Sequence, residues 1–173
     1  MQRSVWLVVS ALAVVPLVSF VPAAHATGAA ACTISGTINF SPSSPTATRG
    51  TWTVEPAVID CHGSFRGWDR ILGPGSFRGR GSYTTAPHRS GPCLQQVGSG
   101  TIDYVIPTSE QDVHLIEPHS FIIAGAGSFT SPTLRGSFQV TSLDDGNCVT
   151  KPASTAFFLA QALLVRSRTL QSL

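Results

Sequence analysis

The sequence predicts an all-β fold, a compact antiparallel β-sandwich or barrel stapled by two disulfides and preceded by an N-terminal signal peptide. Three observations carry this prediction. The 173 residues include 16 glycines and 12 prolines, which interrupt the chain every few residues and disfavour long helices. Between these breaks lie short runs rich in β-branched and aromatic residues, at the regular spacing that is typical of sandwiches and barrels. The chain also carries four cysteines, an even number.

The first 26 residues have the layout of a secretory signal peptide. Arg3 gives a positive start, residues 5–21 are apolar apart from two serines, and Ala24-His25-Ala26 offers a small-x-small cleavage site. Because no charged stop-transfer segment follows, we expect cleavage rather than a retained membrane anchor. Residues 27–173 are then expected to form a single secreted β domain with no transmembrane span, located outside the cell.

Extended segments are expected at regular intervals along this domain. They are Thr33–Phe40, Thr51–Val54, Ala57–Cys61, Leu94–Ile106, Val113–Ile116, Ser120–Ala124 and Gly136–Thr141. Glu55-Pro56 is expected to break the second from the third, or to mark an edge. Gly63-Ser-Phe-Arg-Gly67 recurs as Gly75-Ser-Phe-Arg-Gly79, and this repeat predicts two paired strands of one hairpin.

The last apolar segment, Ala156–Val165, has only Gln161 as a polar residue and suits either a strand or a helix. The β character of its surroundings favours a strand. Such a strand would be apolar on both faces, so we expect it to be central in the sheet or to close it.

Cys32, Cys61, Cys93 and Cys148 all lie in the expected exported part, and an oxidising compartment favours two disulfides. Three pairings are possible. We favour Cys32–Cys61 and Cys93–Cys148, because nested or crossed pairs demand a more specific topology. No two cysteines stand two to four residues apart, so a metal site built on cysteine is not expected.

Catalytic motifs are not found in the sequence, and no catalytic residue, cofactor or metal site is assigned. There is no nucleophile elbow and no phosphate-binding glycine loop. His114-x-x-Glu117-x-His119 resembles a metal-ligand cluster, but Pro118 prevents the helix that such a motif needs. On a strand, the odd spacing points the two histidines to opposite faces. We therefore expect ordinary exposed histidines at a strand–turn boundary.

One segment combines arginines with aromatic rings and is the candidate binding patch. Its residues are Phe65, Arg66, Trp68, Arg70, Phe77, Arg78, Arg80 and Tyr83. Guanidinium groups beside rings suit an anionic ligand, such as single-stranded nucleic acid or an anionic sugar, or the acidic face of an extracellular protein. The alternation equally predicts an ordinary half-buried hairpin with rings inward and arginines outward, which we favour. The whole chain is nearly balanced, with 11 basic and 9 acidic residues, and gives no long-range attraction to nucleic acid.

The run Cys32-Thr-Ile-Ser-Gly-Thr-Ile38, the Gly/Ser-rich strands and the later Gly-Asn-Cys148-Val resemble small secreted four-cysteine β proteins of high-GC Gram-positive bacteria. This resemblance implies export and an all-β fold, and it implies no activity. We therefore expect a secreted, disulfide-stabilised β module with a non-enzymatic binding or structural role. The alternatives are an extracellular hydrolase without a recognisable motif, and a protease inhibitor that presents a rigid loop at residues 41–49 or 84–92.

Overall fold

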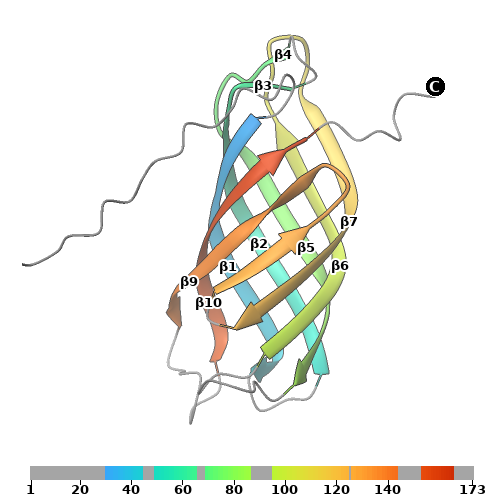
Figure 1. The fold of residues 1–173 in the computed structure, drawn as a ribbon, viewed down its shortest axis with the longest axis vertical. Helices are drawn as coiled ribbons and strands as arrows, with labels where there is room; N and C mark the ends of the chain where they lie inside the picture. The colour runs from blue at the N-terminus through green and yellow to red at the C-terminus, as the bar shows by residue number, and fades with distance from the viewer. Residues whose placement is uncertain are drawn as a thin grey trace, which may run out of the picture.

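The described residues of the computed structural model form a closed eight-stranded antiparallel β-barrel (Figure 1). The structure describes residues 30–44, 49–65, 69–86, 95–124, 126–143 and 153–165. The barrel strands are β1 (Ala30–Ser44), β2 (Arg49–His62), β5 (Gly75–Ala86), β6 (Gln95–Ile106), β7 (Val113–Ala124), β8 (Ala126–Thr130), β9 (Leu134–Leu143) and β10 (Ala153–Leu164). Successive barrel strands are neighbours, and β10 pairs with β1 to close the sheet. The all-β prediction is confirmed, and of its two architectures the barrel is the correct one.

Inward and outward side chains alternate along each barrel strand, which is why the strands have sequence period two. In β2 the alternation changes phase once, at a register shift between Val54 and Ala57. Glu55-Pro56 lies at that shift, where an irregularity accommodates a proline that has no N–H for the ladder. The two short strands expected on either side of this dipeptide are therefore parts of one strand.

The two segments expected on either side of Pro118 are also one continuous strand, β7. Pro118 lies opposite Thr101 and is exposed, so its ring faces solvent. The sequence did not predict β8, which is only 5 residues long and connects β7 to β9.

The C-terminal apolar segment is a strand, as predicted, and it closes the barrel between β1 and β9. Phe158 and Ala160 point into the interior, whereas Phe157 and Leu159 lie on the outer face and are 41% and 44% exposed. This strand therefore carries apolar side chains on both faces, inside the barrel and on its outer surface.

The repeated Gly-Ser-Phe-Arg-Gly segments do not pair with each other, so the hairpin prediction is wrong. The second copy begins β5, which pairs with β2 and β6. The described part of the first copy contributes to β3 (Ser64–Phe65), which pairs with β4 (Asp69–Arg70) in a separate two-stranded sheet near one end of the barrel (Figure 1). Gly63 lies between β2 and β3 with a φ of 118°, a conformation that glycine adopts readily. The chain thus leaves the barrel before the second copy re-enters it.

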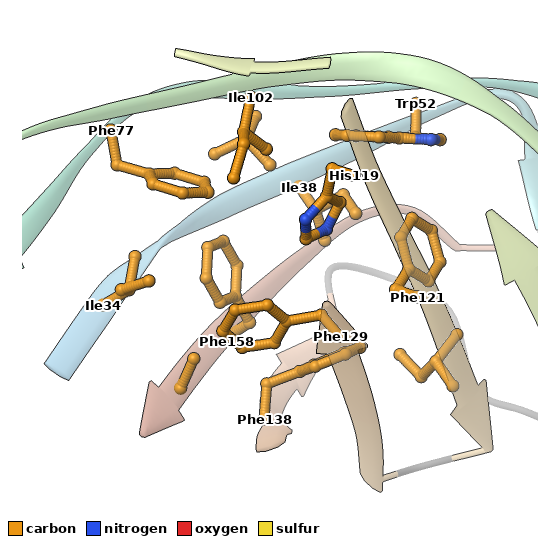
Figure 2. A pocket seen from close by; sticks show the side chains of 13 residues that line it. Ile34, Ile38, Trp52, Phe77, Ile102, His119, Phe121, Phe129, Phe138 and Phe158 are labelled. Carbon is orange, nitrogen blue, oxygen red and sulfur yellow. The ribbon is translucent and has the colours of Figure 1, made fainter. Parts of the chain in front are cut away.

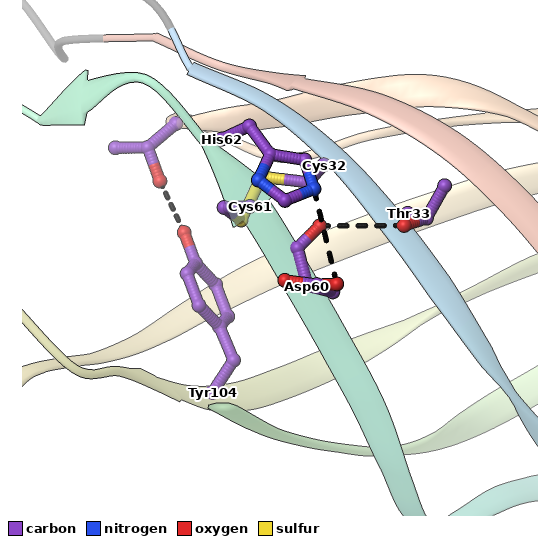
Figure 3. Close-up of a disulfide and its surroundings, with 7 residues drawn as sticks. Cys32, Thr33, Asp60, Cys61, His62 and Tyr104 are labelled. Atoms are coloured by element: carbon purple, nitrogen blue, oxygen red, sulfur yellow. Dashed lines mark hydrogen bonds and ion pairs between the residues drawn. A yellow bond between two sulfur atoms is a disulfide. The ribbon is translucent and has the colours of Figure 1, made fainter. Parts of the chain in front are cut away.

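Cys32 and Cys61 form a disulfide, as predicted (Figure 3). They are direct partners across β1 and β2, with their Cα atoms 4.0 Å apart, and both side chains are buried. Cys93 and Cys148 lie outside the described residues, so their pairing remains a prediction, as does the signal peptide at residues 1–26. Within the described ranges, no helix has the length and apolarity to cross a bilayer.

Candidate functional site: an apolar cavity inside the barrel

A small, partly open cavity lies between the aromatic side chains of the barrel interior (Figure 2). Its volume is about 50 Å³, and all eight barrel strands contribute to its lining. The lining residues are Ile34, Ile38, Trp52, Val54, Phe77, Ile102, His119, Phe121, Ile123, Phe129, Phe138, Phe158 and Ala160. His119 carries the one ionisable side chain among them. The arrangement suits binding of an apolar molecule, since it offers one imidazole and otherwise hydrocarbon and aromatic surface.

Glycines on neighbouring strands make room for the largest rings. A Cβ at Gly79 would lie 2.8 Å from the Trp52 ring, and a Cβ at Gly98 would lie 2.2 Å from the Phe121 ring. Each ring therefore extends across a position that has no side chain. Such a pairing of small with large residues is how small barrels fill a tapering interior.

Trp52 is fixed in this interior by hydrogen bonds as well as by packing. Its indole Nε1 donates to the carbonyl oxygens of Ser82 and Ser99, at 3.2 Å and 3.3 Å. The Phe121 ring meets it edge-on, at a centroid distance of 5.4 Å. The indole N–H is thus already satisfied, and Trp52 presents an apolar face to the cavity.

His119 lies among three aromatic rings in the middle of the cavity wall (Figure 2). Its centroid is 5.5 Å from that of Phe129, 5.9 Å from that of Trp52 and 6.2 Å from that of Phe121. Its Nδ1 atom is buried and has no hydrogen-bond partner among the described residues. Partial burial lowers the pKa of the imidazole to about 4, because fewer water molecules can solvate the charged form. His119 is therefore uncharged at neutral pH.

The predicted separation of His114 from His119 is confirmed, whereas the exposure expected for His119 is wrong. His114 lies on the outer face, where its Nε2 is 2.7 Å from Oδ1 of Asp103. Glu117 and His119 both face the interior, since they are two residues apart on β7. The sequence could have shown which side chains of this strand point inward, if the alternation of inward and outward residues had been continued past Pro118.

Glu117 belongs to a buried polar cluster next to the cavity. Its Oε2 accepts hydrogen bonds from Ser131 Oγ at 2.8 Å, the Thr133 backbone N–H at 3.2 Å and the Tyr104 hydroxyl at 3.4 Å. The Tyr104 hydroxyl also contacts Oγ1 of Thr133, and Figure 3 shows Tyr104 near the disulfide. Burial raises the pKa of Tyr104. The cluster joins β6 and β7 to the β8–β9 turn, and its hydrogen bonds compensate the buried carboxylate.

The candidate binding patch is not brought together on one surface. Phe77 and Tyr83 are buried, at 5% and 1% exposure, whereas Arg78 and Arg80 lie on the outer face of the same strand. Arg70 is exposed on β4. Along β5 the rings thus point inward and the arginines outward, as in a half-buried hairpin. The remaining members, Phe65, Arg66 and Trp68, have side chains outside the described part of the chain.

A shallow groove of about 790 Å³ crosses the outer face, and the sequence did not single it out. One row of paired residues runs through it, from His62 on β2 through Ala31 and Leu163 to Arg135 and Thr130. Because this groove is open to solvent and mixed in polarity, it resembles ordinary barrel surface more than a formed ligand site.

The fold and the cavity define the class: a disulfide-bonded, closed β-barrel with an apolar interior site. No protein family, curated protein or solved structure matches the chain in sequence or fold comparison. The function must therefore be argued from the site itself.

Proposed function

We propose that this protein is an exported, non-enzymatic binding module that holds one small, largely apolar molecule inside its barrel. The observation that carries the proposal is the apolar cavity, with its single imidazole, in the middle of a closed barrel. The interior of an eight-stranded barrel is wide enough to be filled by side chains or to hold one small ligand. Among the residues that the structure describes, none with a hydroxyl, thiol or carboxylate lines the cavity, and this chemistry supports binding rather than covalent catalysis.

The size of the cavity limits the guest. A dry cavity of roughly 150 Å³, lined by aliphatic and aromatic residues, takes up benzene or xenon. The cavity here has about one third of that volume, at about 50 Å³. A guest of very few non-hydrogen atoms fits between the rings as they stand, and a larger one must displace a ring.

Xenon uptake tests the proposal directly, with isoleucine methyl groups as reporters in NMR spectra of the full chain under xenon pressure. We expect saturable shifts of the Ile34, Ile102 and Ile123 methyls, which line the cavity. The methyls of Ile116 and Ile122 are internal controls, because these side chains are 65% and 46% exposed on the outer face. Equal shifts at inner and outer methyls, or no shift at either, would refute the proposal.

A cavity-filling substitution gives an independent check. Ala160 lines the cavity from β10, and Ala160→Val adds about two methylene volumes there. We expect this variant to remain folded and to lose xenon binding. The control is Arg78→Gln, on the outer face, which should bind xenon as the unchanged chain does.

Export is the second part of the proposal, supported by the apolar N-terminal segment, the Cys32–Cys61 disulfide and the resemblance to secreted four-cysteine proteins. The intact mass of protein recovered from the culture medium, with and without reduction and alkylation, tests it. We expect a mass that lacks residues 1–26 and contains no free thiol. A retained leader, or alkylation without prior reduction, would contradict export as a disulfide-bonded domain.

A further inference from the structure

Two buried side-chain polar atoms have no hydrogen-bond partner among the described residues, Thr85 Oγ1 and His119 Nδ1, and of these two residues His119 lines the cavity. Buried polar atoms in proteins nearly always have such a partner. The His119 ring is surrounded by the rings of Trp52, Phe121 and Phe129. An apolar side chain at this position would pack against those rings without leaving a polar atom unsatisfied.

The neighbouring polar groups that the structure describes do not supply the missing partner. The Trp52 indole donates its N–H to Ser82 and Ser99. Oε2 of Glu117, two residues along β7, accepts its hydrogen bonds from Ser131, Thr133 and Tyr104. A single water would also be poorly held, since an ordered water requires two to four polar partners. Among the described residues Nδ1 therefore has no partner, and because the atom itself is buried, a guest hydroxyl reaches it only when a neighbouring ring shifts.

We propose that His119 determines the specificity of the cavity, and that the guest is a small neutral molecule with an apolar body and one hydroxyl group bonded to Nδ1. This inference rests on the proposed function and names the chemical class of the guest. A hydroxyl both donates and accepts, so it pairs with Nδ1 in either tautomer of the neutral imidazole. A pure hydrocarbon would leave this nitrogen unpaired.

The surroundings select a neutral guest over a charged one. Apart from His119 the described lining residues present apolar surface, and moving a charge into such an environment is strongly unfavourable. The buried carboxyl group of Glu117 lies on the same strand and face, with Tyr104 beside it, and further disfavours an anion. The lowered pKa of His119 agrees with this selection, since the imidazole is uncharged at neutral pH.

Ethanol and xenon are the paired probes for the test, one with a hydroxyl and one without. A guest of three non-hydrogen atoms binds no tighter than roughly 0.5 mM, so the titration runs upward from that concentration. The readouts are the Ile102 and Ile123 methyls and the ¹⁵N shift of His119 Nδ1. We expect both probes to shift the methyls, and ethanol alone to shift the Nδ1 resonance as a hydrogen bond forms.

Substitution of His119 separates this inference from the proposed function. In His119→Leu, we expect ethanol binding to weaken at least tenfold while xenon binding persists. His119→Gln keeps a hydrogen-bonding group and should retain part of the ethanol affinity, and His114→Gln, on the outer face, should match the unchanged chain.

Each result has a distinct meaning. Xenon binding together with unchanged ethanol affinity in His119→Leu would overturn the role of His119 and leave the cavity as an apolar site. The absence of saturable binding of either probe to the unchanged chain would overturn the proposed function, and this inference with it. If His119→Leu fails to fold, the Nδ1 shift in the unchanged chain decides, because ethanol must move it and xenon must not.

Discussion

Gly98 on β6 and Phe121 on β7 are direct cross-strand partners, and the Phe121 ring occupies the space that a side chain at position 98 would need. A Cβ at Gly98 would lie 2.2 Å from Cζ of Phe121. The ring has little freedom to retreat, since it packs against Trp52 at 5.4 Å and Phe138 at 6.3 Å. The missing side chain on β6 is therefore a condition for the aromatic lining of the cavity.

Gly98→Ala is expected to destabilise the barrel by about 1–3 kcal/mol, the usual range for overpacking a filled core. Urea denaturation measures the change. The matched control is Gly73→Ala, because a Cβ at Gly73 has no atom within 4 Å and should be nearly neutral. Equal stability of the two variants would show that the Phe121 ring moves aside freely.

The stability of the barrel should decrease as the pH falls from 6.5 toward 4, through His119. The pKa of this imidazole is about 4 in the folded protein and 6.5 as an unperturbed histidine. Between these values the unfolded chain binds the extra proton, so the stabilisation is complete above pH 6.5 and is lost on acidification. The full effect is at most about 3 kcal/mol.

Denaturation curves at pH 7, 5 and 4 test this dependence by comparing the unchanged protein with His119→Phe. The variant should lose the part of the pH dependence that comes from His119 and keep the part that comes from the acidic groups. His114→Gln controls for an exposed histidine of the same strand. A pH profile of His119→Phe that coincides with that of the unchanged protein would contradict the expectation.

Loss of the Glu117 carboxyl group should expose the polar groups that converge on it. Glu117→Leu leaves the Ser131 hydroxyl, the Thr133 N–H and the Tyr104 hydroxyl without this acceptor, and we expect a loss of about 2–5 kcal/mol. Glu117→Gln keeps one acceptor oxygen and should be affected less. Thermal unfolding ranks the two variants against the unchanged chain, and a Glu117→Leu variant as stable as the unchanged chain would contradict the compensation of this buried carboxyl group by its hydrogen bonds.

The Cys32–Cys61 disulfide should stabilise the barrel by about 3–4 kcal/mol in the chain-entropy model, for a sequence separation of 29 residues. The double variant Cys32→Ala/Cys61→Ala measures this contribution by urea denaturation. Peptide mapping without reduction should also recover a Cys32–Cys61 linked pair, and a Cys93–Cys148 pair as the second prediction. A crosslink between Cys61 and Cys93 would refute both pairings.

Local patterns in the sequence predicted most of the strands and one disulfide, because period two and turn residues are short-range signals. β6, β9 and β10 were expected near their observed positions. The pairing of Cys32 with Cys61 follows from two strands adjacent in the chain. The failures have three sources: Pro118 concealed the continuity of β7, two identical pentapeptides suggested a hairpin that does not form, and β8 is too short to stand out.

The candidate site could not be predicted from the sequence, for a different reason. The residues that line the cavity come from eight strands, and their meeting depends on closure of the barrel between β1 and β10. The Arg/aromatic segment suggested a binding patch because its residues are close in sequence, yet Phe77 and Arg78 point to opposite sides of the sheet. Proximity along a strand does not create a shared surface.

By itself, the sequence determined that the chain is all-β, that its cysteines are even in number, and that its last apolar segment suits a strand with two apolar faces. These features depend on composition and on the alternation of neighbouring residues, which are local properties of the chain. Only the tertiary structure decided that the sheet closes on itself and that His119 faces inward among aromatic rings. The physical reason is that closure joins strands distant in sequence. It places an imidazole among aromatic rings, where contact with water is reduced, and this partial burial gives the histidine its lowered pKa and its unpaired nitrogen.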